Sequence, residues 1–132
     1  MGRAPYRLPE TLTAILERAF AGEVAERLPR LLEAADRLAN APDTADAAGQ
    51  VVADAHALAS SAAIVGEDRV SHAARECELL LRPYAGDGGV PPVVADQAAD
   101  AADAVRAALS TWTAGRAPGP GTNPQDASSG AE

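Results

Sequence analysis

The side chain best suited to chemistry in this sequence is His56, which lies in the alanine-rich stretch AHALASSAAIVG, residues 55–66. Imidazole has an ordinary pKa of about 6.5, so its neutral form is a competent nucleophile near physiological pH. The chain has no lysine, and its only cysteine, Cys77, lies on the apolar face of an expected helix. The second histidine, His72, is expected at the surface. We therefore take His56 as the first candidate for a chemical role.

The helix that should carry His56 runs from Thr44 to Val65. Its inward stripe, at helical spacing, is Val51, Ala55, Leu58, Ala62 and Val65. Successive residues of a helix turn by about 100°, which places His56 roughly 140° from Val51 and directs it to solvent. Its expected neighbours on that face are all small or medium-sized: Val52, Ala53, Ala59, Ser60 and Ala63. Such an exposed ring can be reached by a large partner, although an alanine-rich chain places small residues beside every position.

The N-terminal part of the sequence also has helical periodicity. A short helix is expected over residues 9–22, followed by a longer one over residues 23–40. Pro29 lies inside the second pattern and removes a backbone hydrogen bond, which costs roughly 3 kcal/mol in a helix interior. We therefore expect a kink or break near Arg27.

The C-terminal half predicts two further helices, one from Glu67 to Leu81 and one from Val94 to Ala114. Between them, the stretch AGDGGVPP resists both helix and strand. The resulting fold class is all-α, an antiparallel four-helix bundle preceded by a short N-terminal helix and formed by residues 9–114. Residues 115–132 are rich in Gly, Pro and Ser and are expected to form a disordered tail.

Charge and composition exclude several classes of partner. The formal net charge is −8, and the basic residues, all arginines, are scattered among more numerous acids. Nucleic acid and anionic membranes attract clustered basic residues, so neither is an expected partner. No intrachain disulfide is possible with one cysteine, and no further ligands with metal-site spacing stand near His56 or His72. No signal peptide or membrane-spanning stretch is evident, so we expect a cytoplasmic monomer.

The stretch AHALASSAAIVGEDRVSHAARECELL, residues 55–80, resembles the histidine-containing phosphotransfer domains of two-component phosphorelays. The usual pattern of that family is His-x-Leu-Lys-Gly-Ser, a small apolar run and then Gly. The matching positions here are His56, Leu58, Ser61, Ala62 and Gly66. The resemblance covers about residues 10–113 and departs from the pattern at two positions: Ala59 replaces the lysine and Ser60 replaces the glycine.

The resemblance implies a phosphocarrier rather than a true enzyme. His56 would accept a phosphoryl group from the aspartate of a response-regulator receiver domain and pass it on. The receiver would bring Mg²⁺, and this chain would need no cofactor of its own. A sensor histidine kinase is the other partner that the resemblance allows. The receiver would dock around Val52, Ala59, Ser60 and Ala63.

Three other residues receive subsidiary roles. Arg69 and Arg75, on the helix after His56, are candidates to supply the charge of the missing lysine, although surface solvation or an ion pair with Glu67, Glu76 or Glu78 is the more ordinary role for them. Ser61 is a candidate for a local hydrogen bond that steadies the helix, or for simple packing.

Two alternatives to the phosphocarrier stay open on sequence grounds. Ala59 in place of the lysine is compatible with a degenerate adaptor that binds a receiver or another partner without accepting phosphate. A plain helical interaction module is the third hypothesis. The phosphocarrier is favoured because four residues stand together at the spacing of the family pattern: His56, Leu58, Ser61 and Gly66.

Overall fold

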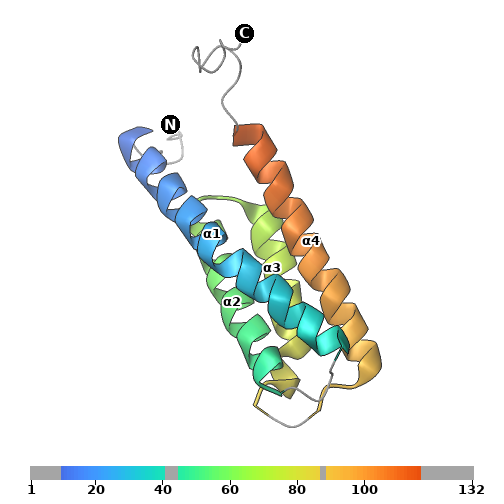
Figure 1. The fold of residues 1–132 in the computed structure, drawn as a ribbon. Coiled ribbons are helices and arrows are strands. Elements are labelled where there is room, and N and C mark those ends of the chain that lie inside the picture. Colours follow the sequence, from blue (N-terminus) through green and yellow to red (C-terminus); the bar gives the residue numbers. More distant parts are fainter. Residues whose placement is uncertain (1–9, 41–44, 87–88, 117–132) are drawn as a thin grey trace, which may run out of the picture.

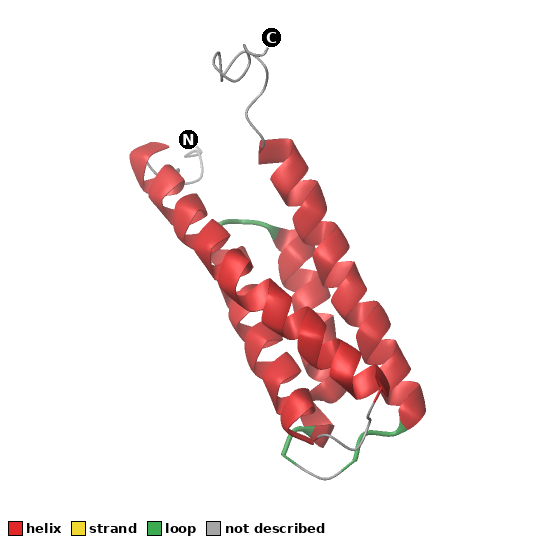
Figure 2. Ribbon diagram, in the orientation of Figure 1, coloured by secondary structure: helices red, strands yellow, loops and turns green. Residues whose placement is uncertain are grey.

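The computed structural model describes residues 10–40, 45–86 and 89–116, and these residues form a bundle of helices without a strand (Figures 1 and 2). The elements are α1 (Glu10–Asn40), α2 (Ala45–Ile64), α3 (Asp68–Leu81), the 3₁₀ turn η1 (Arg82–Tyr84) and α4 (Pro92–Arg116). Consecutive helices run in opposite directions, so the start of α1 and the end of α4 lie at the same end of the bundle (Figure 1). The predicted all-α, antiparallel four-helix bundle is confirmed.

α1 is one continuous helix, and the expectation of a separate short helix before residue 23 is wrong. No break occurs at Pro29 either, although the ribbon changes direction about midway along α1 (Figure 1). A proline removes one hydrogen bond and bends a helix without necessarily ending it. Because α1 packs against both α2 and α4, tertiary contacts outweigh that local cost.

The four helices surround a core made largely of alanine, leucine and valine. α2 packs against α1 and α3, and α4 packs against the same two helices, so α2 and α4 are diagonally opposite. The predicted inward stripe of α2 is buried at Val51, Ala55, Leu58 and Ala62 and half-buried at its last member, Val65. Small residues let the helices approach closely, which places their surface side chains within reach of one another.

The connection between α2 and α3 positions the candidate site. Gly66 has φ of 78°, a left-handed conformation that glycine adopts without steric cost. The N–H of Glu67 donates to the carbonyl of Ala62 at 2.8 Å, and the N–H of Gly66 donates to the carbonyl of Ala63 at 3.1 Å. These two bonds form a Schellman motif, which ends α2 where the sequence predicted and returns the chain as α3 alongside it.

The remaining boundaries differ from prediction by a few residues. α4 begins at Pro92 rather than Val94, because proline is well suited to the first helical position and the carbonyl of Pro91 accepts from the N–H of Ala95. Gly115 and Arg116 belong to α4, and the rest of the predicted tail lies outside the described residues. No helix in the described ranges combines the length and the apolarity that crossing a membrane requires.

Candidate functional site

His56 lies in the middle of α2 with 60% of its side chain exposed. Its ring points into the junction between α2 and α3, where Nδ1 is 3.0 Å from Oε2 of Glu78 on α3. The two residues are 22 positions apart in sequence, and the tight turn at Gly66 brings them together. The phosphotransfer candidate is thus an accessible ring with one nitrogen held by a neighbouring helix.

The carboxylate of Glu78 is almost completely buried, with only 2% of its side chain exposed. The same oxygen, Oε2, also accepts a hydrogen bond from Nη2 of Arg82, one turn later in the chain. The other oxygen, Oε1, is buried and has no hydrogen-bond partner among the described residues. The hydrogen bonds from His56 and Arg82 therefore converge on the same carboxylate oxygen of Glu78.

The arrangement fixes the roles of the two ring nitrogens. An ionised carboxylate offers only acceptors, so the proton shared with Glu78 belongs to Nδ1. In a neutral ring, Nε2 then carries the lone pair. The geometry resembles the general arrangement in which a carboxylate orients a histidine and stabilises its charged form. The contact with Glu78 therefore leaves Nε2 of His56 as the ring nitrogen that is able to act as a nucleophile.

Sequence analysis missed the roles of Glu78 and Arg82. The sequence suggests Glu78 only as an ion-pair partner for Arg69 or Arg75, and it gives Arg82 no role. One signal was available: Glu78 lies one turn after Ala74 and one turn before Leu81, both buried. An acidic residue at the border of an apolar stripe needs a partner, and the facing helix supplies it.

The side chains predicted to surround His56 are small, but one of them, Ala59, does not lie at the surface. Ser60 and Ala63 are exposed, and Val52 and Ser61 are half-buried. Ala59 is fully buried, so the expectation that it forms part of an exposed docking surface is wrong. α3 packs over this position, where the hydroxyl of Ser71 donates to the carbonyl of Ala59 at 3.0 Å.

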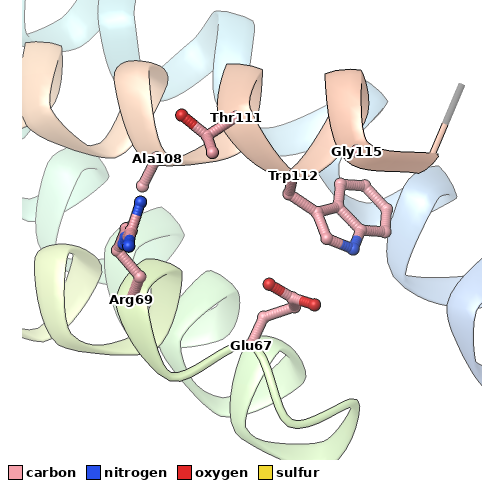
Figure 3. Close-up of a pocket in the computed structure, with 6 residues that line it drawn as sticks. All are labelled: Glu67, Arg69, Ala108, Thr111, Trp112 and Gly115. Atoms are coloured by element: carbon pink, nitrogen blue, oxygen red, sulfur yellow. The ribbon is translucent and has the colours of Figure 1, made fainter.

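The two arginines proposed to replace the missing lysine have different positions. Arg75 is exposed and lies one turn before Glu78 on α3. Arg69 instead lines a pocket of about 420 Å³ between α3 and α4, together with Trp112 and Thr111 (Figure 3). It precedes Glu78 by nine positions, which is about half a turn around the helix, so it faces away from α2 and does not lie beside His56.

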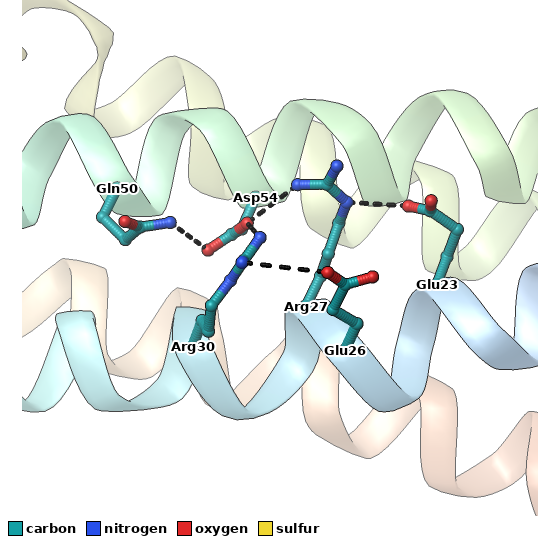
Figure 4. A network of polar contacts seen from close by, with 6 residues as sticks. All are labelled: Glu23, Glu26, Arg27, Arg30, Gln50 and Asp54. Atoms are coloured by element: carbon teal, nitrogen blue, oxygen red, sulfur yellow. Dashed lines mark hydrogen bonds and ion pairs between the residues drawn. The ribbon is translucent and has the colours of Figure 1, made fainter.

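The opposite side of α2 carries an ionic network, centred on the buried Asp54, that joins it to α1 (Figure 4). Asp54 is fully buried and accepts from Arg27 at 3.0 Å, from Arg30 at 3.0 Å and from Gln50 at 2.7 Å. The hydrogen bond to Glu23 is the main reason that the pKa of Arg27 is raised above its usual value, and Asp54 acts in the same direction. This network fixes the helix that carries His56 against α1.

The described part of the chain gives little support to a metal site or to a nucleophilic cysteine. No group of three or more His, Cys, Asp or Glu residues is arranged there to hold a metal ion. Cys77 is fully buried, and burial raises the pKa of its thiol to about 12. The thiolate that a nucleophilic cysteine needs is therefore not formed near neutral pH.

Comparison with protein families gives a match over most of the helical bundle. A family model described as Hpt domain matches residues 16–108. The matched region begins in α1, ends in α4 and includes His56, Glu78 and Arg82. No significant match was found among curated proteins or among solved structures.

Proposed function

Because this chain belongs to the Hpt domain family, whose members are histidine phosphotransfer carriers, we propose that His56 is its phosphoacceptor. The donor is the phosphorylated aspartate of a response-regulator receiver domain, and a second receiver takes the phosphoryl group onward. The observation that carries the proposal is the ring itself: exposed, with Nδ1 bound to the buried carboxylate of Glu78 and Nε2 left for chemistry.

The transfer step follows from this geometry. The lone pair of Nε2 attacks the phosphorus atom while the bond from phosphorus to the aspartate oxygen breaks, and the carboxylate leaves with that electron pair. The imidazole ring gains a positive charge, and the proton on Nδ1 remains shared with Glu78. The negative carboxylate at 3.0 Å stabilises this charge as it forms. Transfer to a second receiver is the same step in reverse.

Positive charge near the histidine comes from Arg82 in this proposal. Its guanidinium shares Oε2 of Glu78 with His56, so it balances the carboxylate and stands close to the ring. Ala59 can supply no charge and lies inside the bundle. Mg²⁺ held by the receiver would supply charge neutralisation for the phosphoryl oxygens. Phosphoryl transfer depends chiefly on such positioning and charge neutralisation.

The small residues around His56 leave room for the donor protein to approach the ring. Ser60 and Ala63 are exposed, and no long side chain follows His56 on its own face for two turns. A receiver can therefore bring its aspartyl phosphate close to Nε2 and in line with it. The adaptor hypothesis predicts that a receiver binds without transferring its phosphate. A direct measurement of phosphate incorporation therefore distinguishes the adaptor from the phosphocarrier.

The test is phosphate incorporation from a small phosphoramidate donor, followed by intact mass spectrometry. The wild-type protein is expected to gain one phosphate that is lost in acid, and His56→Gln is expected to gain none. His72→Gln is the matched control, because His72 is also exposed and lies on the neighbouring helix. Equal phosphorylation of His56→Gln would refute the proposal. Absence of phosphate from the wild type would favour the adaptor.

A further inference from the structure

The carboxylate of Glu78 constrains the ring of His56 after phosphorylation as well as before it. With a phosphoryl group on Nε2, the ring is either neutral, with a lone pair on Nδ1, or a cation with a proton on Nδ1. Nδ1 lies 3.0 Å from Oε2 of Glu78. An ionised carboxylate offers only acceptors, so the neutral form would set two lone pairs against each other at that distance. The contact therefore favours the protonated form of the phosphorylated ring.

The burial of Glu78 makes this hydrogen bond costly to lose. Only 2% of the side chain is exposed, and Oε1 has no hydrogen-bond partner among the described residues. Oε2 accepts from Nδ1 of His56 and from Nη2 of Arg82. If the ring gave up its Nδ1 proton, a carboxylate that water hardly reaches would lose one of these donors.

The other charged groups near α2 do not contact the ring. Arg82 carries a charge that opposes a positive ring, but its hydrogen bond goes to the carboxylate of Glu78. On the side of α1, Arg27 and Arg30 bind Asp54, across α2 from His56. Among the described residues, Glu78 is therefore the charged group that bonds to the imidazole.

We infer that Glu78 keeps the phosphorylated ring of His56 protonated on Nδ1, so that the phosphohistidine is short-lived and is passed on rapidly. This inference rests on the proposed function, since it takes His56 as the phosphoacceptor. It adds that Glu78 sets how long the chain holds its phosphate.

The chemistry of the leaving ring explains the short lifetime. When an aspartate oxygen of a receiver attacks the phosphorus atom, the bond from phosphorus to Nε2 breaks and its electron pair returns to Nε2. A ring protonated on Nδ1 then leaves as neutral imidazole, whereas a ring without that proton leaves as an anion or must first gain a proton. Attack by water follows the same course, with inorganic phosphate as the product and one proton released from the water to solvent.

Glutamine at position 78 would remove the constraint. A side-chain amide has an oxygen that accepts and an NH₂ group that donates. After rotation, the NH₂ group can donate to Nδ1 of a neutral phosphorylated ring, which the carboxylate cannot do. Glu78→Gln therefore permits the longer-lived neutral form. Glu76→Gln is the matched control, because Glu76 is an exposed acid on the same helix.

The experiment measures how long each protein keeps its phosphate. Wild type and both variants are phosphorylated with a small phosphoramidate, freed of the donor and held at pH 8, and intact mass follows the loss of phosphate. The ¹⁵N chemical shift of Nδ1 reports whether that nitrogen is protonated, and circular dichroism verifies the fold. Glu78→Gln is expected to keep its phosphate about tenfold longer than the wild type, a change in barrier that one altered contact can supply. Glu76→Gln should match the wild type, and Nδ1 should be protonated in the wild type and unprotonated in Glu78→Gln.

Equal phosphate lifetimes in the wild type and Glu78→Gln would overturn the inference. So would an unprotonated Nδ1 in the phosphorylated wild type, a result that needs no variant and decides the matter even if Glu78→Gln does not fold. A wild type that takes up no phosphate would refute the proposed function instead.

Discussion

At the scale of single residues, the site depends on one oxygen of one buried carboxylate. Oε2 of Glu78 accepts hydrogen bonds from Nδ1 of His56 and from Nη2 of Arg82. This contact favours the tautomer with the proton on Nδ1 and, in the proposed transfer, places a negative charge where the ring becomes positive. A lone surface histidine has neither advantage.

Replacing Glu78 by Gln should slow phosphorylation of His56 by a small donor about tenfold, equivalent to roughly 1.4 kcal/mol in the barrier. The amide can still accept from Nδ1, but it carries no charge to offset that of the ring. Glu76→Gln is the control, because Glu76 is an exposed acid on the same helix. Single-turnover rates followed by intact mass measure the effect. Equal rates in the wild type and Glu78→Gln would show that the carboxylate plays no part.

Ala59→Lys, which restores the residue type usual in the family, should destabilise this protein. The side chain at this position is fully buried under α3, so extra methylenes and a charge must displace packed neighbours. Overpacking of this kind costs about 1–3 kcal/mol. Urea unfolding measures the change, with the exposed position Ser60→Lys as control. A stability equal to that of wild type would contradict the packing described at Ala59.

The exposure of His56 could be predicted from sequence, because an α-helix fixes which residues share a face. The contact with Glu78 could not, since it depends on how α3 lies against α2. The burial of Ala59 escaped prediction for the same reason. Periodicity within one helix does not show which part of its surface a neighbouring helix covers.

At the scale of elements, α2 is held from both sides. α3 contacts it through Ser71 and Glu78, and α1 contacts it through the network around Asp54. The continuity of α1 was not predicted, because Gly22 and Pro29 each disfavour a helix interior when only the local sequence is considered. The packing of α1 against α2 and α4 keeps the helix continuous. The end of α2 was predicted correctly, because a glycine with positive φ is a local requirement.

The two arginines at Asp54 should act cooperatively. Arg27→Met or Arg30→Met alone leaves the carboxylate one arginine, and each should cost about 1 kcal/mol of unfolding free energy. The double variant leaves a buried carboxylate without a cation and should cost about 3–5 kcal/mol. Chemical denaturation of the four proteins forms a double-mutant cycle. If the loss of unfolding free energy in the double variant equals the sum of the two single losses, the two arginines do not act together on Asp54.

At the scale of the whole molecule, the bundle buries its only thiol in the common core of the helices. Cys77 has a pKa raised by burial to about 12, so the thiol form persists at pH 8, where an unfolded cysteine begins to ionise. Alkylation by iodoacetamide at pH 8 should therefore be very slow in the native protein. It should become fast at the urea concentration where the helical signal is lost. Rapid alkylation of the folded protein would contradict the packing around α3.

The most direct test of the proposed function identifies which nitrogen of which histidine carries the phosphate. The wild-type protein is phosphorylated with a small phosphoramidate, and two-dimensional ¹H–¹⁵N NMR of the imidazole rings, supported by ³¹P spectra, assigns the modified atom. We expect phosphate on Nε2 of His56, with the proton retained on Nδ1 next to Glu78. Phosphate on Nδ1 of His56, or on His72, would contradict it.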